Sequence, residues 1–207
     1  MILTPNVVDL SHYDNVSDWA AIKTFGILGV INKATEGAGM TDKTFAIRRD
    51  SCRAAGMLYG AYHFLRPGDV QAQADHFLSV IDNDPKCLMA LDHEDPKVPL
   101  SLAWKWIDYV NIKTGRMPIL YSGFLIKQQI GNRIDPFWHS VRLWLSHYSA
   151  NPVWPRCWEK PFLVQYTGDG LGPLPHNVPG ISIPGGNGID INSFDGSQAE
   201  LAIQWAK

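Results

Sequence analysis

The feature that most restricts the fold of this chain is an alternation of short β-type runs with longer stretches of helical period. It repeats five times, which is typical of βαβ units and a parallel sheet. Glycines at 26, 56 and 115 follow three of the helical stretches, where a left-handed residue is expected after a helix end. The expected strands are residues 6–9, 27–33, 58–64, 88–92 and 117–121, and the expected helices are residues 17–24, 42–55, 70–81, 100–114 and 123–130.

The pattern changes after residue 130. Three more β-type runs, at residues 141–146, 162–166 and 187–191, are joined by segments rich in Pro and Gly without helical period, chiefly 151–155 and 168–188. Residues 196–205 predict a closing helix. Five strands and three more make eight, so we expect a closed α/β barrel of the TIM type, with five βα units followed by three strands with few helices. An open doubly wound sheet is the alternative, but no GxGxxG or phosphate-loop pattern follows any expected strand.

Length and charge limit the classes of function. The chain has 207 residues, short of the ~250 of a complete (β/α)₈ enzyme, which leaves room for one domain, 1–207, and no second one. Its 18 basic and 20 acidic side chains form no block of like charge, so neither nucleic acid nor a membrane surface is an expected partner. The N-terminal residues lack the pattern of a signal peptide, and three widely spaced cysteines are expected to be buried thiols.

Acidic side chains gather where strands of such a barrel end. Asp9 ends the first strand, Asp92 and Glu94 end the fourth, and Asp190 lies in the eighth. Strands one and eight are neighbours in a closed barrel, so the four carboxyl groups are expected to share one rim, which raises the pKa of at least one of them. An isolated Asp at a strand end is more often a helix N-cap, but four acids at three strand ends are harder to explain in that way.

Other polar and aromatic groups accompany these acids. Carboxyl groups beside aromatic rings suit sugar cleavage, because rings stack on pyranoses while an acid protonates the glycosidic oxygen. A metal site is an alternative, since His63, His93 and His147 are near, but no HxH or HExxH spacing occurs. Trp104 and Trp106 are expected to pack against the barrel. The further rim residues are Lys33, Tyr62, Tyr121, Trp144, Gln165 and Tyr166.

The ordered set of strand-end motifs resembles glycoside hydrolase family 25, the Chalaropsis-type muramidases. The resemblance covers nearly the whole chain and centres on the DxE pair of Asp92 and Glu94. The chain departs from the usual family pattern at Asp14-Asn15, which affects the shape of the first loop, and at Val164. Residues 168–188 are also less typical of the family and are expected to alter one end of the groove. The motifs that carry the resemblance are Val7-Val8-Asp9-Leu10-Ser11, Val30-Ile31-Asn32-Lys33-Ala34-Thr35-Glu36-Gly37, Gly60-Ala61-Tyr62-His63-Phe64, Asp92-His93-Glu94, Leu143-Trp144-Leu145, Gln165-Tyr166-Thr167 and Gly188-Ile189-Asp190-Ile191-Asn192.

This resemblance implies an irregular, flattened barrel and an enzyme that cuts the β-1,4 bond between N-acetylmuramic acid and N-acetylglucosamine in bacterial peptidoglycan. Glu94 would protonate the leaving oxygen, Asp92 would act on the substrate 2-acetamido group, and Asp9 and Asp190 would complete the acidic site. Tyr62, Tyr121 and Trp144 would hold sugar rings. No cofactor or metal is implied.

The biological setting is a further expectation. We expect a monomer with no separate wall-binding domain, like a phage endolysin made in the cytoplasm and released through a holin-type membrane hole. Secretion applies instead if the chain is a mature form. Two alternatives of function stay open: a non-catalytic glycan-binding barrel, and a metal-dependent hydrolase on the same fold.

Overall fold

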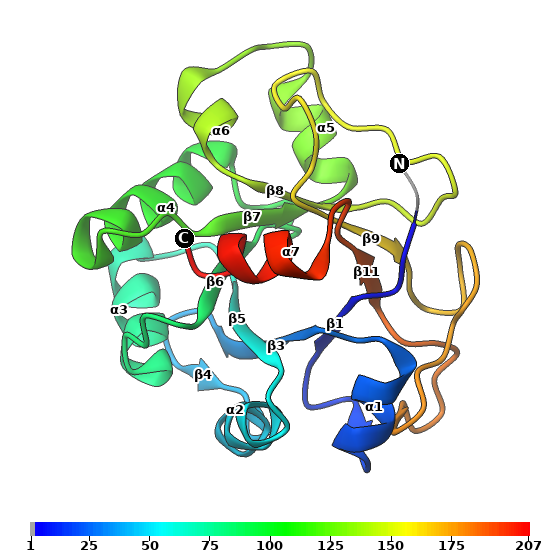
Figure 1. Cartoon of the computed structure of the whole chain (residues 1–207). Helices are drawn as coiled ribbons and strands as arrows, with labels where there is room; N and C mark the ends of the chain where they lie inside the picture. The colour runs from blue at the N-terminus through cyan, green and yellow to red at the C-terminus, as the bar shows by residue number, and fades with distance from the viewer. Residues whose placement is uncertain (1–2) are drawn as a thin grey trace.

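Eight strands close into a barrel in the computed structural model, which describes residues 3–207 (Figure 1). The ring closes because β1 pairs with both β3 and β11. The strands of the ring, in spatial order, are β1 (Val7–Leu10), β3 (Gly29–Glu36), β5 (Leu58–Phe64), β6 (Leu88–Asp92), β7 (Ile119–Ser122), β8 (Leu143–Ser146), β9 (Leu163–Thr167) and β11 (Ile191–Ser193). The predicted barrel is therefore confirmed, and it is irregular.

One strand departs from the expected direction. Seven strands of the ring are mutually parallel where they pair, but β11 runs antiparallel to both of its neighbours, β1 and β9. A parallel connection normally needs a crossover helix, and residues 168–188 form turns and only the short strand β10 (Ile181–Ser182). The chain therefore re-enters the ring from the end at which β9 left it. The prediction of a parallel eighth strand at 187–191 is wrong in direction, and the strand begins later.

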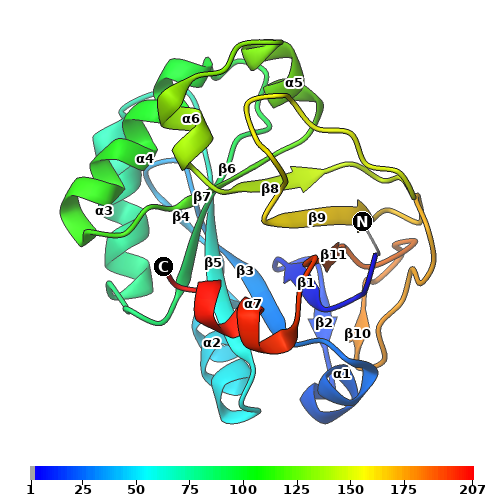
Figure 2. The same ribbon diagram turned by 45° about the horizontal axis from the view of Figure 1, so that its top comes forward.

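Helices cover the barrel unevenly. Figure 2 shows α3 (Val70–Ile81), α4 (Leu100–Thr114) and α6 (Pro136–Ser140) together on one side of the barrel and α1 (Trp19–Phe25) and α2 (Phe45–Ala54) at the bottom of the view, whereas mainly loops surround β9 and β11. Asp18, Asp69 and Asp135 cap the N-termini of α1, α3 and α6, and Gly26, Gly56 and Gly115 have the left-handed conformation expected of them. The other helices are α5 (Phe124–Ile130) and α7 (Gln198–Gln204).

Four short elements were not predicted, one helix and three strands. Helix α6 begins at an Asp135-Pro136 pair, which is a helix-start signal. Strand β4 (Met40–Thr41) folds back on the end of β3. Strand β2 (Asn15–Val16) pairs with β10, so the loop after β1 is fixed to the segment before β11.

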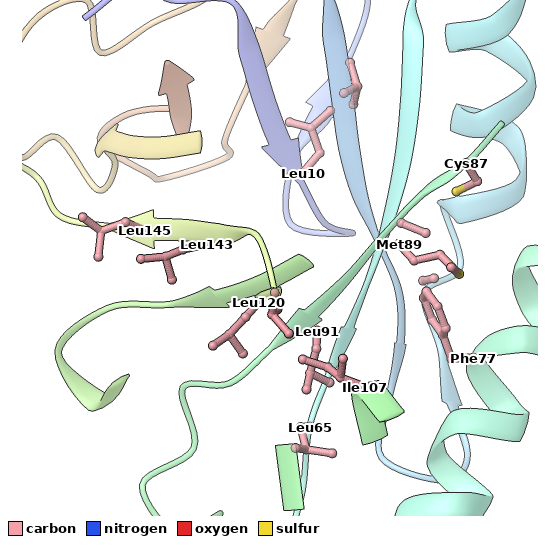
Figure 3. Packing of buried hydrophobic residues seen from close by; sticks show 14 of the residues in the cluster. Leu10, Leu65, Phe77, Cys87, Met89, Leu91, Ile107, Leu120, Leu143 and Leu145 are labelled. Carbon is pink, nitrogen blue, oxygen red and sulfur yellow. The ribbon is translucent and has the colours of Figure 1, made fainter. Parts of the chain in front are cut away.

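The alternation of side chains along β6 divides the core into two layers. Met89 and Leu91 point outward into the layer between strands and helices, which Figure 3 shows together with Phe77 of α3 and Ile107 of α4. Leu88 and Ala90 point into the barrel. The next inward position along the same strand is Asp92, so the strand itself aims this carboxyl group at the barrel mouth.

Helix α7 closes the opposite end of the barrel. Trp205, which follows it, is fully buried and donates a hydrogen bond from Nε1 to the carbonyl oxygen of Tyr59 at 2.8 Å. Its ring lies so close to β3 that a Cβ at Gly29 would come within 2.7 Å of it. The barrel interior is therefore filled with side chains at this end.

The remaining core predictions are confirmed for the cysteines and Trp106 and wrong for Trp104. All three cysteines are buried free thiols, as expected, and burial raises the pKa of Cys52 and of Cys87 to about 12. Trp106 is buried as expected, but Trp104 is 40% exposed and touches Phe137 edge-on, so its expected packing against the barrel is wrong. Within residues 3–207, no helix has the length and apolar character needed to cross a bilayer.

Candidate active site

A small pocket of about 80 Å³ opens at the end of the barrel opposite α7. Asp9 and Asp92 reach it from the carboxyl ends of β1 and β6, and Glu94 from the segment after β6. Asp190 reaches the same rim because it precedes a strand of reversed direction. Larger hollows lie elsewhere on the surface, so the residues of this pocket distinguish it, not its size. Its lining consists of Asp9, Tyr62, Asp92, Glu94, Tyr121, Trp144 and Asp190.

Two amide side chains hold the Asp9 carboxylate. Gln165 Nε2 donates to both of its oxygens, at 3.0 and 3.1 Å, and Asn192 Nδ2 donates to Oδ1 at 2.7 Å. The amides are oriented in turn, because Tyr121 donates its hydroxyl proton to Gln165 Oε1 at 2.9 Å and Trp144 Nε1 donates to Asn192 Oδ1 at 2.6 Å. Asp9 therefore has a fixed position at the base of the pocket.

Asp190 is held differently. Its Oδ1 accepts a hydrogen bond of 3.3 Å from the Tyr148 hydroxyl. A Cβ at Gly168 would come within 2.0 Å of Asp190 and 2.4 Å of Tyr148, so a residue without a side chain is needed there. The turn segment 168–188 thus begins against the pocket.

The segment that carries Glu94 is fixed from both sides. The carbonyl oxygen of His93 accepts a hydrogen bond of 2.7 Å from Ser122, and the His93 ring points away from the pocket to Gln129 on α5, at 2.8 Å. Asp95 binds Arg66 at 2.9 Å and accepts from the backbone N–H of Lys97 at 2.9 Å. Glu94 itself remains accessible to solvent. A rigid support therefore presents one accessible acid at the pocket mouth.

All four carboxyl groups have a raised pKa. Burial is the main cause in each case, and the Asp190 charge raises the pKa of Asp9 further while the Glu94 charge raises that of Asp92. Glu94 is exposed as a residue, but the side chains around its carboxyl group still displace water from it and so raise its pKa. Burial and the nearby charges of Asp169 and Asp14 raise the pKa of Asp190 to about 7. The pocket can therefore hold a protonated carboxylic acid near neutral pH, which a general acid requires.

One cation acts on half of this cluster. The charge of Lys33 lowers the pKa of Asp92 and of Glu94, opposing burial. Lys33 is buried and forms an ion pair with Glu36 at 2.5 Å, and Glu36 also binds Arg66. Lys33 is thus held beside the pocket as a charge and does not form part of the lining.

The predicted site residues fall into three groups: those that line the pocket, those that lie just outside it, and one that does not reach it. The four acids, Tyr62, Tyr121 and Trp144 line the pocket. Trp144 is 1% exposed, so it forms the base of the pocket and offers no open ring face. Gln165 and Lys33 lie just outside and act on the acids.

Tyr166 does not reach the site. It follows Gln165 on β9, so its side chain points to the opposite face of the strand and is buried in the outer core layer. Its expected contact with substrate is therefore corrected, because a side chain on that face cannot touch a ligand in the barrel mouth.

Three contributing residues were not among the predicted site residues. Asn192 holds Asp9, Tyr148 holds Asp190, and the Asp169 charge raises the pKa of Asp190. Tyr148 and Asn192 each follow a predicted site residue closely along the chain, and this closeness in sequence is the feature that could have identified them as site residues. Asp169 has a left-handed backbone in a turn, which no local pattern in the sequence places near Asp190.

The histidines proposed as metal ligands bind other groups. His63 contacts Thr35 and Gln73 and stacks on Trp106, and His147 accepts a hydrogen bond from the backbone N–H of Val153 at 2.9 Å. In the described part of the chain, no group of three or more His, Cys, Asp or Glu side chains has an arrangement suited to a metal ion.

Comparison with known proteins gives a consistent result. The model of glycosyl hydrolases family 25 matches residues 8–173. A bacterial lysozyme from Streptomyces coelicolor superposes with a TM-score of 0.82 at 25% identity, over 98% of each chain. A muramidase from Acremonium alcalophilum superposes with a TM-score of 0.76 at 26% identity, over 94% of this chain and 95% of that one. An N,O-diacetylmuramidase from Arthroderma benhamiae is 27% identical over 71% of this chain and 69% of its own length.

The family match covers most of the barrel and three of the four acids, namely Asp9, Asp92 and Glu94, while Asp190 lies beyond it and joins them through the fold. The chain belongs to glycosyl hydrolase family 25 and is a glycoside hydrolase.

Proposed function

We propose that this protein is a muramidase that hydrolyses the β-1,4 bond between N-acetylmuramic acid and N-acetylglucosamine in bacterial peptidoglycan. The observation that carries the proposal is the pocket itself, in which four carboxyl groups from three strands meet two tyrosines in a chain of a glycoside hydrolase family. Lysozymes and muramidases among its structural relatives support the substrate class.

Glu94 is the proposed general acid. It is the most accessible of the four acids and its pKa is raised, so its proton is available to the glycosidic oxygen. Proton transfer to that oxygen accompanies breakage of the C1–O bond, and the N-acetylglucosamine side leaves as an alcohol. A water molecule then supplies a hydroxyl group to C1 and returns a proton to Glu94, which completes the hydrolysis.

The other acids stabilise the charge that develops at C1. Asp92 is buried on the same inward face as Glu94, and the neighbouring Lys33 charge favours its ionised form. We assign it to the 2-acetamido group of the substrate or to the positive charge at C1. Asp9 accepts three hydrogen bonds, which also favour a carboxylate at the base of the pocket.

Tyr62 and Tyr121 are the proposed contacts for the sugar at the cleavage point. Tyr62 is half-buried at the pocket wall, and the Tyr121 ring is held edge-on against Trp144 with 4.5 Å between ring centres. Burial and the nearby acids raise the pKa of both hydroxyl groups, so both stay protonated. The Tyr62 hydroxyl can donate to a sugar oxygen, whereas Tyr121, which donates its proton to Gln165, offers its hydroxyl oxygen as an acceptor.

Mass spectrometry of a peptidoglycan digest tests this proposal. Purified peptidoglycan incubated with the protein should yield fragments that end in reducing N-acetylmuramic acid. Fragments ending in reducing N-acetylglucosamine would assign a different bond, and binding without any new reducing ends would favour a glycan-binding barrel. Loss of cleavage in a chelator, with recovery on adding a divalent metal, would favour the metal-dependent alternative.

A further inference from the structure

A second hollow adjoins the pocket at Glu94. Its volume is about 330 Å³, against about 80 Å³ for the pocket of carboxyl groups, and Glu94 lines both. The proton donor therefore stands between a small acidic space and a larger, more open one. The lining of the larger hollow is Glu94, Pro96, Gly123, Phe124, Leu125, Gln128 and Ser146.

This larger hollow has the chemistry of a sugar-binding surface. Phe124 is 73% exposed, although a large aromatic side chain is normally at least half covered in a folded chain. Among residues 3–207 only Tyr13 and Phe124 are aromatic residues with more than half of their surface exposed, and of these two only Phe124 lines a hollow together with a predicted catalytic acid. Gln128 lies one helical turn after Phe124 and is also exposed, so an amide stands beside the ring.

The elements that carry the hollow are tied to Glu94. Phe124 and Gln128 belong to α5, and Gln129 of the same helix binds both His93 and, through Nε2 at 3.0 Å, the carbonyl oxygen of Val98. The floor of the hollow is open because position 123 is glycine, where a Cβ would come within 3.2 Å of the Ser146 carbonyl oxygen. Helix α5 therefore holds its exposed ring at a fixed distance from the proton donor.

We infer that this hollow binds the leaving-group sugar, the N-acetylglucosamine released when Glu94 donates its proton. The inference depends on the proposed function. The small acidic pocket holds the sugar at which charge develops, so the sugar on the other side of the broken bond must lie across Glu94 from it. Phe124 stacks on the apolar face of that sugar, and Gln128 pairs with its acetamido or hydroxyl groups.

Two substrates distinguish binding of the leaving sugar from a general effect on activity. One is a peptidoglycan glycan strand, which fills both sides of Glu94. The other is the β-fluoride of the N-acetylglucosamine–N-acetylmuramic acid disaccharide, which carries the same donor sugars but has fluoride as its leaving group. Phe124→Ala should lower kcat/KM on the glycan strand by roughly 5- to 30-fold, the usual range for loss of one stacking contact, and leave hydrolysis of the fluoride within about twofold. Gln128→Ala should lower kcat/KM on the strand by about 2- to 5-fold.

Matched variants control the experiment. Ile112→Ala truncates a side chain with the same 73% exposure on α4, outside both hollows, and should change neither rate. Phe124→Trp keeps an aromatic face and should retain most of the activity on the strand.

Each other outcome overturns the inference in an identifiable way. If wild-type protein cuts the strand and Phe124→Ala cuts it equally well, the hollow does not bind the leaving sugar, and the muramidase proposal stands. If Phe124→Ala loses activity on both substrates, the ring supports the acidic pocket instead. If activity falls on the strand alone and the pH profile of kcat/KM on the strand also moves, the ring acts on Glu94 and not on the leaving sugar. If wild-type protein cuts the strand but not the fluoride, the division of the two hollows is wrong. If wild-type protein releases no reducing ends from the strand, the proposed function fails and the inference fails with it.

Discussion

The two sides of the acidic pocket are built on different principles. Asp92 and Glu94, the β6 side, lie two residues apart on one segment, and the charge of Lys33 lowers the pKa of both. Asp9 and Asp190, the β1/β11 side, come from opposite ends of the chain. Among the charged groups near them, other acids shift their pKa values most. Neutral amide or hydroxyl groups form their hydrogen bonds. The comparison indicates that the cation adjusts proton affinity on the β6 side, while hydrogen bonds fix geometry on the other.

Removing the Asp92 charge should have the largest effect among changes that test this division. Asp92→Asn keeps the side-chain shape but removes the charge that faces the developing positive centre, so we expect kcat to fall by roughly 10²- to 10³-fold with an unchanged fold. Initial rates of reducing-end release give the comparison, with circular dichroism as the control for folding. A rate within threefold of wild type would remove Asp92 from the mechanism.

Removing the cation should move the pH dependence of catalysis. Lys33→Met takes away a charge that lowers the pKa of both Asp92 and Glu94, so both pKa values rise. Catalysis needs one of these two carboxyl groups protonated and the other ionised, so both limbs of the kcat/KM profile should shift to higher pH.

Lys113→Met, which removes a lysine from the outer helix α4, is the control for net charge and should leave the profile in place. A profile that does not move in Lys33→Met would mean that Lys33 has only a structural role.

The β1/β11 side should show its character in stability. The pKa of Asp190 is about 7 in the folded protein, against 3.8 for the free group, so the folded state binds more protons between these pH values. The free energy of unfolding therefore falls as pH rises across that interval. Asp190→Asn removes this loss, and should raise stability at pH 7 by roughly 1–2 kcal/mol, or about 2–8 °C in Tm.

Thermal unfolding at several pH values measures this effect. The difference between Asp190→Asn and wild type should shrink as the pH falls below 3.8, where wild-type Asp190 becomes protonated in both states. Equal stabilisation at every pH would contradict the role of the carboxyl charge.

Tyr166→Phe should have the smallest effect. The hydroxyl group of Tyr166 is buried without a hydrogen-bond partner, on the face of β9 away from the pocket. Its removal should change kcat and KM by less than about twofold and leave stability equal or slightly higher. A large rise in KM in steady-state kinetics would return Tyr166 to the substrate site.

The helix-covered part of the barrel could be predicted closely from the sequence. The expected strands at 58–64 and 88–92 and the expected helices at 70–81 and 100–114 coincide with β5, β6, α3 and α4. In this part hydrophobic period, helix caps and turn glycines all agree, so local pattern and tertiary structure favour the same elements.

The loop-covered part could be predicted only in outline. The direction of β11 and the pairing of β2 with β10 depend on contacts between segments more than 150 residues apart, for which the local pattern has no signal. Asp190 was nevertheless placed at the correct rim. The predicted parallel strand would have ended near Asp190 at this rim. The actual β11 runs in the opposite direction and begins just after Asp190, so Asp190 lies at the same rim.

The candidate site could be predicted to the level of its lining residues. The hydrogen bonds that hold these residues could not be predicted, namely those from Asn192 and Gln165 to Asp9 and from Tyr148 to Asp190. The single-domain organisation, the monomeric state and the route of release to the cell wall stay predictions.

The central claim is that Glu94 donates the proton in peptidoglycan cleavage, and the rate of reducing-end release by Glu94→Gln tests it most directly. The amide keeps the size and polarity of the side chain but has no acidic proton, so kcat on purified peptidoglycan should fall by roughly 10³-fold or more while Tm and glycan binding are retained. A variant that folds, binds and cleaves at a rate within tenfold of wild type would contradict the claim.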